Sequence, residues 1–388
     1  MKKENPDTFR IIVKTLTGLE HLLAEELTAI GAEHPVLLNR AVEFYGTDEH
    51  LYKANYLCRT AMRVLKVIAE FPVSDENDLY AKIKEIDWPG FLSVEQTLAV
   101  NAVVNRSSIT HSHYAALKVK DAVVDRFREA TGRRPSVDPE HPDLRINVHI
   151  NGTNCSVSVD SSGDSLHKRG YRRVQGEAPL SEVLASGMIM LTGWDGEQEL
   201  LDPMCGSGTI LTEACMISSN TPAGYFRKSF GFEKWNGFDK KMWEDIKAGA
   251  NRAISPVKAT VYGFDKSSRT LNAARINIKA AGFENQVVLK AIAFEHSTPP
   301  SDDGIIVTNP PYGERIKSGD IRSLYKMMGD VLKKYYTGWR AWLITSDSSA
   351  LKSVGLRTSK KITLFNGPLE CRFVKYELYS GSKKAKYR

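Results

Sequence analysis

The sequence predicts an α/β protein with an α+β N-terminal region and a C-terminal parallel sheet joined by crossover helices. Two observations lead to this prediction. From about residue 178 onward, apolar strand patterns alternate regularly with helix patterns, which is typical of βαβ units. Before that point, shorter strands and helices follow one another in a less regular order. The length of 388 residues is sufficient for about two or three domains.

The composition is that of an ordinary globular protein, with 42% hydrophobic and 26% charged residues. No apolar run approaches the roughly 20 residues that span a membrane, and the N-terminal segment lacks the apolar core of a signal peptide. The five cysteines are scattered without a C-x-x-C pair, which argues against a zinc or iron–sulfur site and fits a reducing compartment. We therefore expect a cytoplasmic protein that uses neither a membrane nor a metal.

Residues 1–68 are expected to form a first small α+β domain. Strand patterns at residues 9–16 and 41–47 flank an amphipathic helix at residues 18–32. A helix that runs into a strand follows at residues 50–71.

Residues 69–164 are expected to form a second α+β domain. Its predicted elements are a helix at residues 78–86, a strand at 97–105, a long helix at 113–132 and a hairpin at 145–162. Asn151 and Gly152 form the favoured dipeptide of a two-residue type I′ turn, so we place the hairpin turn there.

Residues 178–388 are expected to form the parallel-sheet domain, which opens with a helix that has Pro179 near its first turn. The predicted strands are residues 198–203, 260–266, 286–294, 304–310, 340–347, 361–367 and 372–379. The last two lie close enough in sequence to pair as an antiparallel edge. A long insertion rich in aromatic residues, 219–258, separates the first two strands.

Residues 165–177 are expected to be a basic linker between the N-terminal region and the parallel-sheet domain. The formal net charge is +7, and the excess is unevenly distributed. Residues 1–177 carry 23 basic and 25 acidic side chains, whereas the rest carry 30 and 21. The stretch "LHKRGYRR" within the linker is a local exception in the N-terminal half. Such charge suits a polyanionic partner, although many enzymes of similar charge bind none.

The stretch "LLDPMCGSGTI", residues 200–210, combines a strand that ends in an acid, a glycine-containing turn and a helix start. Ligands of α/β sheets bind beyond the carboxyl ends of the strands, and Gly206 and Gly208 allow the backbone to approach such a ligand. The stretch has neither the P-loop lysine nor the G-x-G-x-x-G pattern. Asp202 would repel a pyrophosphate but attract a cation such as S-adenosylmethionine. Asp265, at the tip of the next strand, could accept both ribose hydroxyls of a nucleoside.

The stretch "IVTNPPYGER", residues 306–315, places an amide, two prolines and an aromatic directly after a strand. An exocyclic amino group of a base is a poor nucleophile, because its lone pair is delocalised into the ring. The Asn309 side-chain oxygen and the Pro310 carbonyl could accept its two N–H groups and stabilise the developing positive charge. Tyr312 could stack on the base. Carbon methylation would need a nucleophilic cysteine beside this motif, and none is present, so nitrogen is the expected target.

These motifs resemble those of the class I, Rossmann-like amino methyltransferases, through "DPMCGSGT" and "NPPYGER". Together with "HKRGYR", "APLSEVLASGM" and "FEKW", the chain is similar along nearly its whole length to bacterial RNA methyltransferases with an N-terminal THUMP domain. The nearest type makes N2-methylguanosine in 23S rRNA and is often described as an N6-adenine-specific DNA methylase. The resemblance implies a ferredoxin-like domain, a THUMP domain and a catalytic domain, with S-adenosylmethionine as cofactor and RNA as partner.

On this resemblance, Asn309, Pro310 and Tyr312 hold the target base. The predicted cofactor-binding residues are Asp202, Met204, Gly206, Gly208, Asp265, Lys266, Ala293, Phe294 and Asn309. The predicted RNA-binding residues are Lys168, Arg169, Arg172 and Arg173, for which a solvated linker is the alternative. Relatives often place an acid after the third strand to hold the adenine amino group, where this chain has Ala293 and Phe294.

Three other functions fit part of the pattern. Methylation of adenine N6 in DNA uses the same N-P-P-Y motif, although the first 165 residues fit an RNA-binding module better than a DNA target-recognition domain. Methylation of guanine N2 in tRNA uses the same architecture. A binding protein with an inactive catalytic domain fits poorly, because Asp202, Asp265 and the N-P-P-Y motif are intact. The sequence does not identify the modified nucleotide or the oligomeric state.

Overall fold

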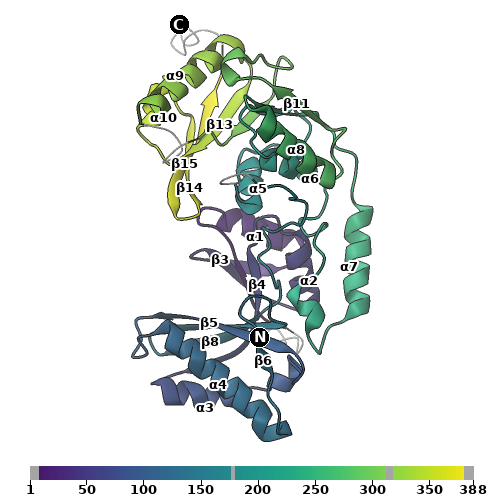
Figure 1. Cartoon of the computed structure of the whole chain (residues 1–388), viewed down its shortest axis with the longest axis vertical. Helices are drawn as coiled ribbons and strands as arrows, with labels where there is room; N and C mark the ends of the chain where they lie inside the picture. The colour runs from purple at the N-terminus through teal and green to yellow at the C-terminus, as the bar shows by residue number, and fades with distance from the viewer. Residues whose placement is uncertain (1–7, 176–179, 312–317, 380–388) are drawn as a thin grey trace. The chain divides into compact units, whose positions relative to one another are not determined.

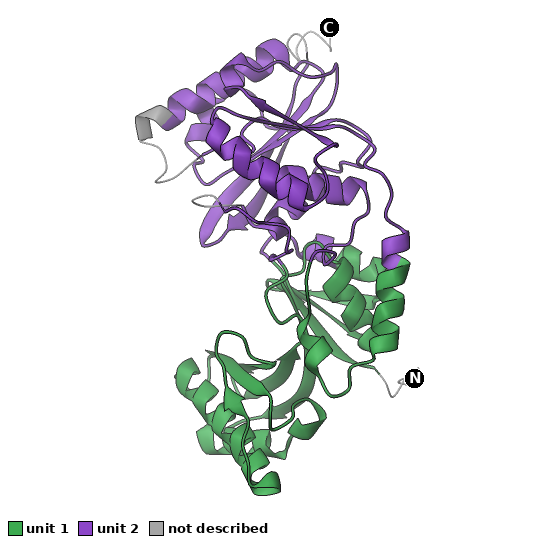
Figure 2. Ribbon diagram, turned by 45° about the vertical axis from the view of Figure 1, so that its right-hand side comes forward, with its two compact units in different colours: residues 1–15, 24–166, 227–249 green, residues 16–23, 167–226, 250–388 purple. Residues whose placement is uncertain are grey.

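The computed structural model describes residues 8–175, 180–311 and 318–379, with 318–320 described as backbone only. The chain divides into two compact units, which Figure 2 shows in separate colours. The first unit comprises residues 1–15, 24–166 and 227–249, and the second comprises residues 16–23, 167–226 and 250–388. Within these described ranges, each unit contains one sheet.

The first unit contains an eight-stranded sheet (Figure 1). In sheet order its strands are β2 (Glu33–Leu38), β3 (Ala41–Gly46), β1 (Phe9–Lys14), β4 (Arg63–Pro72), β8 (Asn154–Asp160), β7 (Leu144–Asn151), β5 (Thr97–Asn105) and β6 (Ser136–Val137). Helices of this unit include α2 (Asp48–Leu57), α3 (Glu76–Glu85), α4 (Ser112–Thr131) and all but the first turn of α1 (Glu20–Ala29). Strand β4 pairs with β1 on one side and with β8 on the other. The boundary predicted between residues 68 and 69 therefore falls inside a strand that both predicted N-terminal domains share.

The residue pattern of helix α4 explains why residues 112–131 form a helix that packs on the sheet. Its buried residues recur at helical spacing, which gives the helix one apolar face for the sheet. They are Ala115, Val119, Ala122, Val123, Val124 and Phe127. The helix ends at Gly132, which has a φ of 70° and so adopts the left-handed conformation that glycine tolerates best.

Strand β2 was not predicted, and its burial pattern gives the reason. It lies at the edge of the sheet, and most of its residues are exposed. Such a strand lacks the apolar–polar alternation from which strands are recognised. Pro35 fits here because an edge strand does not need every N–H for pairing.

The predicted type I′ turn at Asn151 and Gly152 is wrong by one residue. Asn151 pairs with Asn154 across the β7–β8 hairpin, so the two loop residues are Gly152 and Thr153. Gly152 has a φ of 63°, and among the described residues Thr153 is not one with a positive φ. A positive φ at the first loop position alone is the pattern of a type II′ turn.

The predicted aromatic insertion, residues 219–258, has its middle part within the first unit. Phe232 stacks on Tyr52 of α2, with ring centroids 4.3 Å apart, and Trp243 meets Tyr56 edge-to-face. Trp243 belongs to α7 (Lys240–Arg252). The aromatic residues of the insertion therefore complete the core of the N-terminal unit.

The second unit contains a seven-stranded sheet. In sheet order its strands are β11 (Val287–Ala291), β10 (Val261–Asp265), β9 (Leu200–Asp202), β12 (Ile305–Thr308), β13 (Arg340–Thr345), β15 (Leu369–Glu377) and β14 (Lys360–Asn366). The first five are parallel, and β15 is antiparallel to both β13 and β14. The helices of this unit are α5 (Glu182–Leu191), α6 (Thr209–Ser218), α8 (Ser268–Ala280), α9 (Ser318–Tyr335) and α10 (Ala350–Ser353).

All seven strands predicted for this unit are present, and the α/β fold class is confirmed. Strand β9 lies between β10 and β12, and the chain leaves it toward β10 and β11 before returning to β12. The switch point of the topology is therefore beside the end of β9, where an open α/β sheet binds its ligand. Among the described residues, no helix has the length and apolar character to cross a membrane.

Candidate active site

The ends of four neighbouring strands, β9 to β12, surround one cavity in the second unit. Its volume of about 1380 Å³ exceeds the roughly 300–1,000 Å³ of a usual small-molecule pocket. The lining residues on the strand-end loops are Asp202, Pro203, Met204, Cys205, Gly206, Ser207, Asp265, Lys266, Ser267, Ala293, Phe294, Glu295, Asn309 and Pro311. The cavity therefore brings together all predicted cofactor-binding residues except Gly208.

The two loop glycines have different roles. Gly206 and Gly208 both have a positive φ, of 56° and 81°. A Cβ on Gly206 would meet no atom within 4 Å, because this residue faces the cavity. A Cβ on Gly208 would lie 3.2 Å from the Cβ of Ala274 and 3.3 Å from Ile278 Cδ1, both on α8. Gly208 therefore allows close packing of α8, and its predicted approach to the ligand stays a prediction.

Asp202 joins the ends of β9 and β12. Its side chain is 2% exposed, and its Oδ1 accepts hydrogen bonds from Thr308 Oγ1 at 2.7 Å and from the Met204 N–H at 3.1 Å. Burial raises the pKa of the Asp202 carboxyl to about 7, and the nearby charge of Asp265 adds to this. A buried carboxylate at this point favours a cation in the cavity, because a cation would compensate the cost of its charge.

Asp265 connects β10 to the glycine loop. Its Oδ2 accepts the Gly206 N–H at 3.2 Å, and its Oδ1 accepts the Ser267 N–H at 2.8 Å. A carboxylate has about four acceptor sites, so each oxygen can accept a further hydrogen bond from a hydroxyl. Lys266, the next residue, is exposed and also lines the cavity.

The loop after β11 contains a residue that the sequence interpretation missed. Phe294 is 4% exposed and packs near Tyr336, and Ala293 lines the cavity beside it. Glu295 also lines the cavity and is exposed. Glu295 directly follows Ala293 and Phe294, where the resemblance predicted an acid and none was found. A search of the sequence for an acidic residue within two positions of this pair would have identified Glu295.

Asn309 follows β12 and has a buried side-chain oxygen. Among the described residues, its Oδ1 has no hydrogen-bond partner, although it is removed from solvent. Pro310 is buried and Pro311 lines the cavity, so the residues after Asn309 are packed rather than solvated. Tyr312 lies outside the described residues.

The basic segment at residues 168–173 is largely not a surface patch. Lys168 and Arg173 are exposed, and their contact with RNA stays a prediction. Arg169 is 1% exposed and forms an ion pair with Glu213, at 3.6 Å. Arg172 is mostly buried against Glu182, with Nε 2.8 Å from Oε1. We therefore do not expect Arg169 and Arg172 to contact RNA, because carboxylates distant in sequence hold both inside the second unit.

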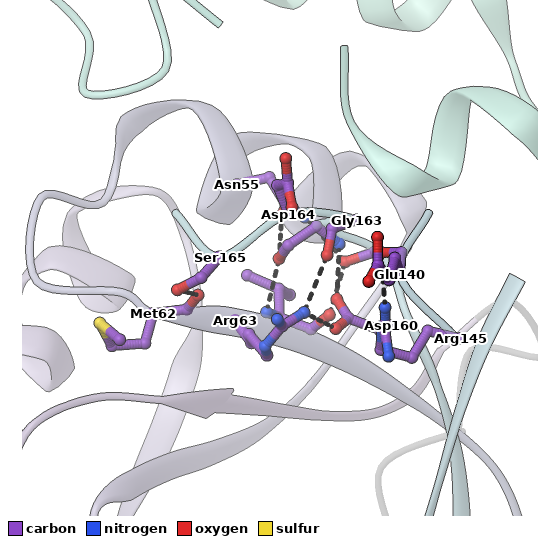
Figure 3. Close-up of polar contacts among 12 residues, drawn as sticks. Asn55, Met62, Arg63, Glu140, Arg145, Asp160, Gly163, Asp164 and Ser165 are labelled. Carbon is purple, nitrogen blue, oxygen red and sulfur yellow. Dashed lines mark hydrogen bonds and ion pairs between the residues drawn. The ribbon is translucent and has the colours of Figure 1, made fainter. Parts of the chain in front are cut away.

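Cationic side chains gather on the sheet of the first unit instead. Lys14 and Arg63 are directly opposite on β1 and β4, and Figure 3 shows Arg63 donating a hydrogen bond to Asp160. Burial lowers the pKa of Arg145, and the charge of Arg63 contributes to this. Burial also lowers the pKa of Lys14, with Arg63 and Arg40 contributing. Burial is the main cause of both lowered pKa values, and the buried Asp160, which pairs with Arg63, partly offsets them.

Comparison with known families identifies three consecutive segments. An RlmL ferredoxin-like domain matches residues 10–65, a THUMP domain matches residues 73–160, and an RMKL-like methyltransferase domain matches residues 169–375. These matches confirm the resemblance inferred from the motifs.

Three similar proteins cover most of the chain. A Synechocystis sp. protein provisionally named an RNA methyltransferase is 40% identical over 93% of this chain and 95% of its own length. The ribosomal RNA large subunit methyltransferase K/L of Syntrophotalea carbinolica is 39% identical over 93% of this chain, which spans only 52% of that protein. The crystal structure of SMU.472, provisionally named a methyltransferase and complexed with S-adenosylhomocysteine, is 27% identical, with a TM-score of 0.87 over 97% of this chain and 100% of that chain.

Proposed function

Because the chain belongs to the THUMP-containing, RMKL-like methyltransferases, we propose that it methylates the exocyclic N2 of a guanine in 23S rRNA. The chain is an S-adenosylmethionine-dependent RNA methyltransferase. The choice of guanine N2 and of 23S rRNA rests on the site and on the relatives.

The cavity fits S-adenosylmethionine, which supplies an electrophilic methyl group on a sulfonium when bound. Asp202 is positioned to offset a positive charge in the cavity, and Asp265 has free acceptor capacity for hydroxyl groups. Gly206 leaves open space where a Cβ would otherwise intrude. The volume is larger than one small ligand requires, which leaves room for a base.

The observation that carries the proposed chemistry is the buried Oδ1 of Asn309, which has no hydrogen-bond partner in the part of the chain that the structure describes. A buried acceptor without a partner is unfavourable by about 1–3 kcal/mol, so its retention at the lip of a cavity points to a donor supplied by the substrate. An exocyclic amino group is such a donor. As the C–S bond breaks and the new C–N bond forms, nitrogen gains positive charge and then loses one proton to solvent. The Asn309 oxygen is placed to stabilise that charge.

Nitrogen is favoured over carbon as the methyl acceptor. Cys205 is the cysteine that lines the cavity among the described residues. Burial raises the pKa of its thiol well above the ordinary value, with Asp202 and Asp265 contributing. The thiol therefore stays protonated, and it is poorly suited to attack a base, because the thiolate is the nucleophilic form.

The cationic group on the first unit supports an RNA substrate. Lys14 and Arg145 would neutralise backbone phosphates, whereas Arg63 is held by the buried Asp160. The presence of a THUMP domain on the same sheet agrees with this role.

Nucleoside mass spectrometry tests the proposal. RNA from cells that lack the gene is incubated with the purified protein and isotope-labelled S-adenosylmethionine, and 23S rRNA and tRNA are then digested separately. We expect labelled N2-methylguanosine from the 23S rRNA fraction. The same nucleoside from tRNA alone would overturn the rRNA assignment, and labelled N6-methyladenosine would overturn the guanine assignment. A parallel reaction with Asn309→Ala shows whether the label depends on this site.

A further inference from the structure

The segment that leads into the catalytic domain is fixed to the outside of the glycine loop, and Asn277 of α8 makes the connection. Asn277 is 1% exposed. Its Oδ1 accepts the N–H groups of Arg173 at 2.8 Å and Val174 at 2.9 Å. Its Nδ2 donates to the carbonyl oxygens of Val174 at 2.9 Å and Ser207 at 3.1 Å. An amide side chain has two acceptor and two donor positions, so every position of Asn277 is used in tying this segment to the loop.

Arg172 makes a second connection on the same segment. Its Nη1 donates to Ser207 Oγ at 3.3 Å, and its Nη2 donates to Thr209 Oγ1 at 3.0 Å. The other side of the guanidinium donates to Leu180 O at 3.1 Å and to Glu182 Oε1 at 2.8 Å. The planar, rigid donor fork therefore holds the loop from behind while an ion pair with Glu182 fixes its own position.

A third connection anchors the helix that begins at the loop. Tyr171 donates a hydrogen bond to Glu213 Oε1 at 2.9 Å, and Ser186 donates one to Glu213 Oε2. Glu213 belongs to α6, is 0% exposed and also forms the ion pair with Arg169. Residues 169–174 thus contact the loop and the helix that follows it at several points. In addition, Val174 and Gln175 line the cavity.

We propose that Arg172 and Asn277 are positioning residues that hold the glycine loop, residues 205–209, in its cofactor-binding shape. Neither residue lines the cavity. Both act through Ser207, which does line it, and Arg172 also acts through Thr209, which lines it and begins α6. Without them, binding of the cofactor would have to order the loop, and affinity would fall by the cost of that ordering. The inference rests on the cofactor and does not depend on which RNA base is methylated.

The test is a mutant cycle read by S-adenosylhomocysteine affinity in calorimetry. Arg172→Ala removes the donors, and Ser207→Ala with Thr209→Val removes the acceptors while leaving the ion pair between Arg172 and Glu182 intact. We expect each change to weaken binding about tenfold, the size of one lost hydrogen bond to a charged group. We expect the combined variant to resemble Arg172→Ala alone, because both changes remove the same hydrogen bonds. Multiplying effects would instead show that the hydroxyls touch the cofactor directly, and would overturn the proposal.

Amide hydrogen exchange of residues 204–210 in the cofactor-free protein gives a second readout. The proposal predicts faster exchange in Arg172→Ala and in Asn277→Leu. It also predicts a raised KM for S-adenosylmethionine and a kcat that changes less than about twofold, because only ground-state binding is weakened. Unchanged exchange and unchanged affinity in folded variants would overturn it.

Arg173→Ala is the matched control, because its side chain is exposed and its backbone bond to Asn277 remains. It should leave cofactor affinity unaltered. If Arg172→Ala does not fold, loop exchange in the Ser207→Ala, Thr209→Val variant decides the question.

Discussion

The two halves of the candidate active site differ in how their polar groups are satisfied. At the ends of β9 and β10, the carboxylates of Asp202 and Asp265 accept hydrogen bonds from Thr308, Met204, Gly206 and Ser267. At the end of β12, the Oδ1 of Asn309 is buried without a partner among the described residues. The first half is therefore already held in shape by the chain, whereas the second half presents an acceptor that a substrate can use.

This difference indicates that the buried Asn309 oxygen, which is unfavourable for stability, serves a function. Folded proteins pair nearly all of their buried polar groups, and local exceptions are expected at functional sites. We call the ends of β9 and β10, with Asp202 and Asp265, the satisfied half of the site, and the end of β12, with Asn309, the unsatisfied half. Mutations in the satisfied half should weaken cofactor binding or stability, because they remove hydrogen bonds that the folded chain already makes. Mutations in the unsatisfied half should slow the reaction without lowering stability.

The largest expected effect is that of Asn309→Ala. Removal of the acceptor should slow methyl transfer by roughly 10²–10³, the range for one preorganised electrostatic contact. Cofactor affinity should change little, and the free energy of unfolding should not fall, because this side-chain oxygen accepts no hydrogen bond from the described residues. Single-turnover transfer at saturating cofactor and RNA measures the rate, and thermal unfolding measures the stability.

Asn309→Asp is the matched variant. It keeps an acceptor oxygen, and its negative charge suits an amine that becomes positive, so it should be less harmful than alanine. A near wild-type rate for Asn309→Ala would place the chemistry elsewhere and remove the contrast between the two halves.

Asp265→Ala should have the next largest effect, this time on binding. Loss of charge-assisted hydrogen bonds should weaken S-adenosylmethionine binding by about 1–3 kcal/mol, or roughly 5- to 150-fold. Part of this loss would come from the loop, because Asp265 also accepts the Gly206 N–H. Titration calorimetry measures the affinity, with the exposed Glu284→Ala as control. Unchanged affinity in a folded Asp265→Ala protein would exclude this residue from the cofactor site.

The sequence indicated the positions of Asp202 and Asp265 better than the burial of residues 169–174, the segment that supports the glycine loop. Asp202 and Asp265 were identifiable because each ends a strongly apolar strand, and parallel strands end at one edge of a sheet. The burial of Arg169 and Arg172 could not be predicted in the same way. Their partners, Glu213 and Glu182, are known only once the chain is folded, and a basic run by itself is equally typical of a solvated surface.

The exact position of the hairpin turn and the packing of the loop glycines could not be predicted from the sequence. The dipeptide at residues 151–152 indicated a hairpin, but the register, set by pairing over the whole of β7 and β8, placed the turn one residue later. In the same way, the pattern of two loop glycines did not show that Gly208 packs closely against α8.

A pair of glycine variants sharpens the contrast within the satisfied half. Gly206→Ala and Gly208→Ala should each cost about 1–2 kcal/mol of stability, because alanine is strained at positive φ. Gly208→Ala should cost more, since its Cβ would also press against Ala274 and Ile278. Gly206→Ala should show the greater loss of cofactor affinity, because its Cβ would enter the cavity. Thermal unfolding and calorimetry on both variants separate the two effects, and equal losses of affinity would contradict the assignment.

The smallest expected effect is a pH dependence of cofactor affinity that arises from titration of the Asp202 carboxyl. Its pKa of about 7 in the cofactor-free protein means that part of the population is neutral at pH 6 to 7. If a cationic cofactor requires the carboxylate, affinity should rise about tenfold between pH 6 and pH 8, as expected for one titrating group. Asp202→Asn should remove this component of the pH profile, and its Oδ1 can still accept the hydrogen bonds of Thr308 and Met204.

Stability should change with pH in the opposite direction. The folded pKa of Asp202 is raised above the ordinary 3.8, so its contribution to stability is fully present below that value and is lost as pH rises through about 7. The melting temperature of the cofactor-free protein should therefore fall between pH 6 and pH 8, and that of Asp202→Asn should fall less. The protonation of the cofactor's own amino group affects both proteins equally, so the difference between their affinity profiles isolates Asp202. Parallel profiles would show that the carboxyl is charged throughout this range, and that the satisfied half attracts its ligand without any change in protonation.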